Sequence, residues 1–99
     1  MLTTLAFFVA LAPSSGAQTR GPEWTGQTVD VRGSVIAMDG TCRQLQLDDG
    51  RGRLWACYVD ADKAPGMLAR AHVHGMVRDT RCTRVGSQWW SIPVVAGVT

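Results

Sequence analysis

The 99-residue sequence predicts a small all-β domain, a five-stranded barrel, preceded by a secretory signal peptide. Apolar and polar residues alternate with a period of two along several short segments, which is typical of half-buried strands. Turn sequences rich in glycine, aspartate and proline separate these segments. No stretch has the pattern of a long helix, so strands must supply the core.

The first 17 residues are expected to be the signal peptide. Residues 2–13 form an apolar run interrupted by only two threonines, and Ser15-Gly16-Ala17 supplies the small residues that signal peptidase needs. Cleavage is expected after Ala17. The alternative is an uncleaved anchor, but the run is shorter than the ~20 apolar residues of a bilayer span. We therefore expect a periplasmic or secreted protein, with no membrane insertion after cleavage.

The charge balance of the sequence excludes few classes of function. All charged residues follow the leader, so the formal net charge of +2 belongs to the mature chain, and nine of its ten cations are arginine. Arginine suits planar or bidentate contacts to anions. The excess is too small to predict nucleic-acid binding by itself.

The domain proper is expected over residues 29–99. Residues 18–28 are polar and contain Gly21-Pro22, which predicts a flexible lead-in. In the first strand Val29, Val31 and Val35 alternate with polar residues. Gly33 lies in the middle of this strand, where a glycine is typical of a bulge or sharp bend. Asp39-Gly40 then predicts a hairpin turn.

The second and third strands are expected over 42–48 and 53–59, joined by the turn Asp49-Gly50-Arg51-Gly52. Alternation assigns their side chains to two faces. The inward side chains are those of Leu45, Leu47, Leu54, Ala56 and Tyr58. The outward side chains are those of Gln44, Gln46, Trp55, Cys57 and Val59.

Residues 60–68 contain Pro65-Gly66 and leave room for one helical turn at most. The fourth strand is expected over 69–79, with Gly75 in its interior. Residues 81–87 are expected to be a polar loop, and the fifth strand follows over 88–98. Pro93 donates no ladder hydrogen bond, so this strand should lie at an edge or be bulged there.

This arrangement resembles the OB-fold, a five-stranded Greek-key barrel, in its tRNA-anticodon-type and small exported bacterial forms. The resemblance covers nearly all of the mature chain and rests on three motifs: Val31-Arg32-Gly33-Ser34-Val35; Leu47, Asp49, Gly52 and Leu54; and Val73-His74-Gly75-Met76-Val77. The helix that OB-folds place between the third and fourth strands is reduced here to a Pro-Gly segment. Met67 and Leu68 are expected to plug that end of the barrel instead.

The resemblance implies an extended ligand, an oligosaccharide, nucleic acid or peptide, on the outer face of the second and third strands. The expected site residues are Arg32, Ser34, Gln44, Gln46, Arg53, Trp55, Arg81 and Arg84. An exposed Trp55 among glutamines and arginines would stack on a base or a sugar ring. The alternative is that Trp55 packs under a loop.

Three cysteines in an oxidising compartment indicate one disulfide and one leftover thiol. The Asp49-Gly50 turn places Cys57 nearly opposite Cys42, so Cys42–Cys57 is favoured. Cys82 could instead pair with Cys42 across the same face.

No catalytic site is expected, because the acidic residues form no catalytic set and no Ser-His-Asp order, phosphate loop or paired-CxxC site occurs. No cofactor is expected either. His72 and His74 leave one face of the fourth strand and could chelate copper or zinc if a third ligand joined them.

The leading hypothesis is an exported, monomeric, non-enzymatic binding protein. The first alternative is a structural accessory whose fifth strand docks to another envelope protein through its tryptophans and valines. The second alternative is metal binding at His72 and His74.

Overall fold

The structure is a computed structural model that describes residues 23–99, so the expected signal peptide and residues 18–22 lie outside the described part. Its strands are β2 (Thr28–Asp39), β3 (Cys42–Leu47), β4 (Arg53–Tyr58), β5 (Arg70–Val85) and β6 (Gln88–Val98). A single 3₁₀ turn, η1 (Ala61–Lys63), joins β4 to β5, as the Pro-Gly segment predicted. In residues 23–99 no helix is long and apolar enough to span a membrane.

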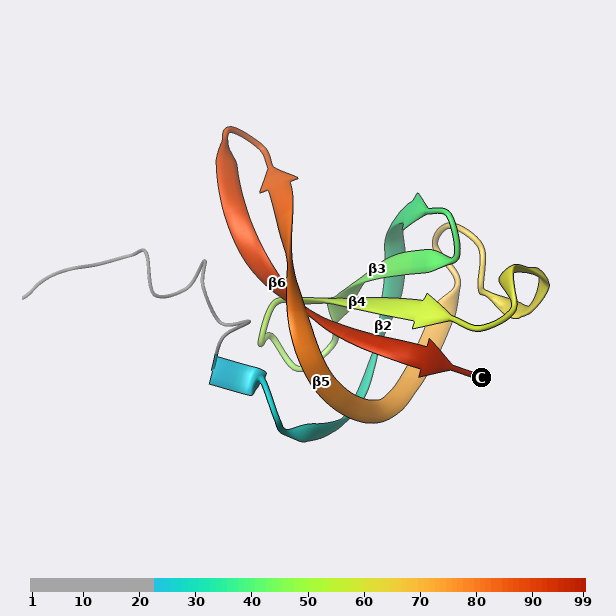
Figure 1. Ribbon diagram of the computed structural model, residues 1–99. Coiled ribbons are helices and arrows are strands. Elements are labelled where there is room, and N and C mark those ends of the chain that lie inside the picture. The colour runs from blue at the N-terminus through green and yellow to red at the C-terminus, as the bar shows by residue number, and fades with distance from the viewer. Residues whose placement is uncertain (1–22) are drawn as a thin grey trace, which may run out of the picture.

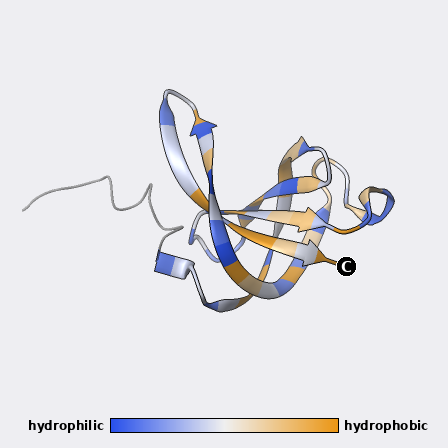
Figure 2. Cartoon of the chain, viewed as in Figure 1, coloured by the Kyte–Doolittle hydropathy of each residue, from blue (hydrophilic) through white to orange (hydrophobic). Residues whose placement is uncertain are grey.

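The five strands form one sheet that closes on itself in the order β2-β3-β4-β6-β5 (Figure 1). Neighbouring strands are antiparallel except β4 and β6, which run parallel from the Trp55–Val94 pair. The expected all-β class is therefore confirmed. Figure 2 shows the apolar residues concentrated on the strands of the closed part.

The core follows the predicted alternation. Val29, Val31 and Val35 are buried on β2, and the inward residues assigned to β3 and β4 are buried as well. Gly33 pairs with Leu47, and a Cβ atom built on Gly33 would lie 2.4 Å from the carbonyl oxygen of Gln46. The glycine therefore allows the two backbones to approach more closely than any side chain would permit.

Arg43, not Met67 or Leu68, closes the end of the barrel beneath the β4–β5 connection. The expectation of a hydrophobic plug is wrong, because Met67 and Leu68 are exposed, Leu68 by 77%. Arg43 is buried; its Nε donates to the carbonyl of Pro65 at 2.6 Å and its Nη1 to the carbonyl of Gly40 at 2.8 Å. Alternation with Leu45 and Leu47 places Arg43 on the inner face, and backbone carbonyls compensate its burial.

Trp24 belongs to the barrel core, although the sequence predicted a flexible lead-in as far as residue 28. Its side chain is buried in the cluster that contains Val29 and Val77. The backbone is tied to β5 as well, since Gly26 N–H donates to the Val77 carbonyl and Val77 N–H donates to Gln27. Core packing therefore reaches back to Trp24, and backbone hydrogen bonding to Gly26, upstream of the first strand.

β5 continues to Val85, so the prediction of a polar loop over 81–87 is wrong. Residues 79–85 pair with 88–94 of β6 to form a two-stranded ribbon, here called the arm, which projects from the closed part of the sheet (Figure 1). Gly86, with φ of +64°, lies in its turn. Residues 79–85 are mostly polar. Because successive side chains point to opposite sides of the ribbon, one side can be covered by the sheet while the other faces water.

Candidate ligand-binding surface

The arm lies against the outer face of β3 and β4, where the ligand site was expected. Trp55 Nε1 donates to Thr83 Oγ1 at 2.8 Å, and the Arg81 guanidinium stacks on the Trp55 ring at 4.5 Å from its centroid. Arg81 also pairs with Asp39 at 2.6 Å. One side of the arm is therefore anchored to β4 and to the end of β2.

Trp55 is only 5% exposed, so the expectation of an exposed stacking residue is wrong and the alternative of a covered Trp55 agrees with the structure, with the arm in place of a loop. Trp55 and Ile92 are both buried, yet neither belongs to the cluster that fills the barrel. They form a second apolar layer between the arm and the sheet. A ligand cannot stack on Trp55 while the arm is in place.

Gln44 is on the outward face of β3, as alternation predicted, and it is only 4% exposed there. Its register partners are Trp55 on β4 and Ala37 on β2. Its side-chain oxygen accepts a hydrogen bond from Arg53 Nη1 at 3.0 Å. Gln44 therefore orients Arg53.

Arg53 is the centre of the accessible part of this face. Its Nε donates to Gln46 Oε1 at 3.3 Å, and its guanidinium lies 5.3 Å from the centroid of the Trp90 ring. Arg53 forms no ion pair within residues 23–99. Two neutral amides and an aromatic ring thus hold a cation whose charge no carboxylate of the described chain neutralises.

Two other donors in this region are unpaired. Arg81 Nη1 and Trp90 Nε1 are buried and have no acceptor among the described residues. Buried donors in folded proteins are nearly always hydrogen-bonded. The contact between arm and sheet therefore carries a surplus of donors over acceptors.

Arg84 is not part of this face. Because Arg81 and Arg84 are three residues apart on one strand, their side chains leave opposite sides of the arm. Arg84 lies over Trp89, 5.9 Å from its centroid, and its Nε donates to the Gly86 carbonyl at 3.1 Å. Trp89 is 60% exposed. The solvent side of the arm thus carries a second arginine–tryptophan pair.

Arg32 is also separated from Arg53. It is exposed on the outer surface of β2, where its register partner is His72 on β5. Ser34, two residues further along β2, accepts a hydrogen bond from Arg70 Nη1 at 2.9 Å. The structure therefore brings together Gln44, Gln46, Arg53, Trp55 and Arg81, and it places Arg32 and Arg84 elsewhere.

Both histidines are on one face of β5, as predicted, and both are exposed. His72 Nε2 is hydrogen-bonded to Asp30, and this contact lowers the pKa of the Asp30 carboxyl. Residues 23–99 contain no group of three or more His, Cys, Asp or Glu side chains arranged to hold a metal ion. The third ligand that metal chelation requires is thus not supplied by this part of the chain.

Cys42 and Cys57 are register partners and form the favoured disulfide, so the alternative Cys42–Cys82 bridge is not formed. Cys82 is free and exposed. The disulfide lies on the outer face of β3 and β4, in the same side-chain columns as Gln44 and Trp55. The bond cross-links β3 to β4, the strand that carries Arg53. It is also compatible with an oxidising compartment.

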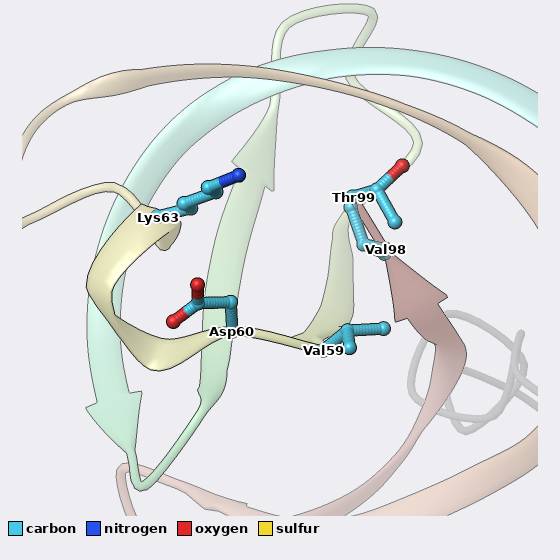
Figure 3. Close-up of a pocket in the computed structure, with 5 residues that line it drawn as sticks. All are labelled: Val59, Asp60, Lys63, Val98 and Thr99. Atoms are coloured by element: carbon cyan, nitrogen blue, oxygen red, sulfur yellow. The ribbon is translucent and has the colours of Figure 1, made fainter.

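A cavity of about 270 Å³ lies near the carboxyl end of β6, well away from the arm. It is lined by Val59, Asp60, Lys63, Val98 and Thr99 (Figure 3). The Asp60 carboxylate already accepts a hydrogen bond from Asp62 N–H, as the N-cap of η1. The remaining lining is mostly apolar.

Sequence reasoning missed the partners that organise the face, namely Asp39, Thr83 and Trp90. A signal existed for Thr83 and Trp90: if 81–85 is extended, alternation places Thr83 beside Arg81 and opposite Trp90. Nothing local indicated that Asp39 would meet Arg81, 42 residues away.

Comparison with known proteins adds no relative: no family model, curated protein or solved structure matches the chain.

Proposed function

We propose that the chain is an exported, non-enzymatic OB-fold protein that binds an extended ligand on the surface around Arg53. In this proposal, the ligand contacts Arg53, Gln46 and the accessible edge of Trp90, and its acceptor groups meet the arginine. An oligonucleotide and an anionic oligosaccharide both offer that combination of rings and acceptors.

The strand arrangement supports the OB-fold part of the proposal. β2, β3 and β4 are consecutive antiparallel neighbours, and β5 returns to lie beside β2. That order is a Greek key, and OB-folds are five-stranded Greek-key barrels that bind on the face of their second and third strands. β3 and β4 are those strands here.

The set of partners around Arg53, namely Gln44, Gln46 and Trp90, is the single observation that carries the proposed binding function. Other arginines of this chain have partners that belong to the fold: Arg70 meets Asp48, Arg51 meets Asp49, and the buried Arg43 meets backbone carbonyls. Arg53 meets only amides and a tryptophan ring. It is therefore oriented in advance and retains its charge for an external anion, which lowers the entropic cost of binding.

Export is supported by the disulfide and by the predicted leader. A bond between Cys42 and Cys57 persists in oxidising compartments and is rare in the cytosol. The absence of enzymatic activity is proposed because the sequence offers no catalytic set of residues.

The test is fluorescence anisotropy with labelled single-stranded oligonucleotides and labelled anionic glycan fragments at two salt concentrations. We expect Arg53→Gln to weaken binding by about tenfold, the loss of one charge-assisted contact. Arg53→Lys should recover part of the affinity, because it keeps the charge but loses the planar contacts. Arg51→Gln removes the same charge from the neighbouring turn and is the matched control.

Salt dependence separates charge-driven from stacking-driven binding, and the two labelled panels identify the ligand class. Phosphate-driven binding weakens steeply as salt rises, whereas binding dominated by ring stacking changes little. Equal affinities of the Arg53→Gln and Arg51→Gln variants would contradict the proposed surface, whichever ligand binds.

A further inference from the structure

The arm has an open strand edge that the ligand surface does not use. Within residues 23–99, β5 pairs with β2 over Arg70–Met76 and with β6 from Val77 onward. Along Asp79–Val85 the edge turned away from β6 therefore has no strand partner among the described residues. Such an edge presents backbone donors and acceptors in the spacing of a β-ladder. Two backbone groups of this segment already have side-chain partners, since the Thr80 N–H donates to Asp79 Oδ1 and the Arg81 carbonyl accepts from Thr83 Oγ1.

We propose that this β5 edge, Asp79–Val85, is a docking site for an extended acidic segment of a partner protein, which adds to the arm as a third strand. Strand addition draws affinity from main-chain hydrogen bonds and specificity from the side chains beside the edge. The proposal does not depend on the ligand surface around Arg53, because it uses backbone groups of the edge and the side chain of Arg84, which leaves the opposite side of the arm from Arg81.

The positive charge of the arm favours an acidic segment as the added strand. The edge carries two arginines, Arg81 and Arg84, against one acidic residue, Asp79, whose carboxylate accepts from the Thr80 N–H, and no acidic residue follows it along the arm. Arg81 is paired with Asp39, whereas Arg84 forms no ion pair within residues 23–99. The Gly86 carbonyl and the Trp89 ring hold Arg84 on the solvent side of the arm. A glutamate or aspartate of an added strand would reach its remaining N–H groups.

The exposed tryptophan supports a protein partner. Trp89 is 60% exposed, and Trp and Arg are enriched among the residues that dominate binding energy at protein interfaces. A second copy of this chain is the poorer occupant, because its edge would bring the same arginines. A nucleic acid would match the charge but cannot pair with a strand edge.

The opposite edge of the arm is less suitable. Over Gln88–Pro93, β6 pairs with β5 only, but this edge ends at Pro93, which has no N–H to donate. Arg84 is also on β5. The β5 edge therefore offers both the longer run of backbone groups and the uncompensated charge.

The probe is a capped peptide of alternating glutamate and valine, long enough to pair with the whole edge. We expect saturable binding by the full mature chain, with the largest ¹⁵N–¹H shift changes at the amides of 79–85. The same peptide methylated at every backbone nitrogen should not bind. Arg84→Gln should weaken binding about fivefold or more, and Lys63→Gln, an equal charge change on η1, should leave it within twofold.

Three outcomes would overturn the proposal. The methylated peptide could bind as well as its parent, which would make the contact purely electrostatic. The shift changes could map to the face around Arg53 instead of the arm. Sedimentation of the chain alone could show a concentration-dependent dimer, with the amides of 79–85 protected in it, so that a second copy occupies the edge.

Discussion

At Gly33 a missing side chain decides whether β2 and β3 can pair. A Cβ there would lie 2.4 Å from the Gln46 carbonyl oxygen, and that oxygen belongs to the backbone of the neighbouring strand. At Gly75 the added Cβ would lie 2.6 Å from Val95 Cγ1, which is a side-chain atom. Only the second clash can be relieved without moving a strand.

We therefore expect Gly33→Ala to lower the free energy of unfolding by about 3 kcal/mol, at the upper end for overpacking, and Gly75→Ala by about 1 kcal/mol. Urea unfolding followed by circular dichroism measures both. Equal losses in the two variants would contradict the distinction between backbone and side-chain contacts.

Asp48 gives a prediction on pH at the same scale. Arg70 makes two hydrogen bonds to its carboxylate, and these contacts hold the pKa of Asp48 below its usual range. Since the carboxyl is more acidic in the folded than in the unfolded chain, its contribution to stability is present above about pH 4 and is lost as the pH falls through the lowered value. Stability should therefore decline on acidification.

The measurement is an NMR titration of the Asp48 carboxyl carbon in the wild type and in Arg70→Gln. The midpoint should rise toward the ordinary value of about 3.9 in the variant. An unchanged midpoint would show that Arg70 does not stabilise the ionised form.

At the scale of elements, the attachment of the arm depends on Trp55. We expect Trp55→Ala to cost about 3–5 kcal/mol in the free energy of unfolding, as for other buried tryptophans. Trp55→Phe should cost less, because the ring still supports Arg81 and Thr83 can still donate to the Arg81 carbonyl. Urea unfolding tests this order, with Trp89→Ala as the exposed control; that variant should change stability by about 0.5 kcal/mol or less.

The elements also show what a sequence can and cannot predict. β3 and β4 were predictable because Leu45 and Leu47, and Leu54, Ala56 and Tyr58, recur at every second residue, and β6 because it is rich in valine, isoleucine and tryptophan. The last third of β5 was not, since Arg81 to Val85 contains one strongly apolar residue, and the contacts that hold it extended come from Trp55 and Asp39. The same long-range contacts bury Trp55, so its exposure could not be judged from its polar neighbours.

The plug illustrates the same limit. Period-two alternation placed Arg43 beside Leu45 and Leu47 on the inner face, but a charged residue is rarely expected in a barrel. Its burial is compensated by carbonyls of Pro65 and Gly40, which the sequence does not bring together. The alternation pointed inward at Arg43, but no direction was assigned to its side chain from the sequence, and only the fold supplied its partners.

For the whole molecule, one covalent bond contributes a large part of the stability. Cys42 and Cys57 are separated by 15 residues, and closing a loop of that size removes chain entropy worth about 3 kcal/mol. Replacing both by alanine should lower the free energy of unfolding by about that amount. Guanidinium unfolding measures it, and Cys82→Ser, which breaks no bond, should leave the midpoint in place.

The position of that disulfide bears on how the chain folds. It joins two strands that are consecutive in sequence, so it needs only the β3–β4 hairpin, whereas the β2–β5 and β4–β6 pairings join distant segments and are slow to find. In an oxidising compartment the chain can therefore be oxidised before its sheet closes. Once bonded, the β3–β4 hairpin is a local nucleus on which the β2–β5 and β4–β6 pairings can form. Stopped-flow refolding should therefore be faster from the oxidised than from the reduced unfolded chain.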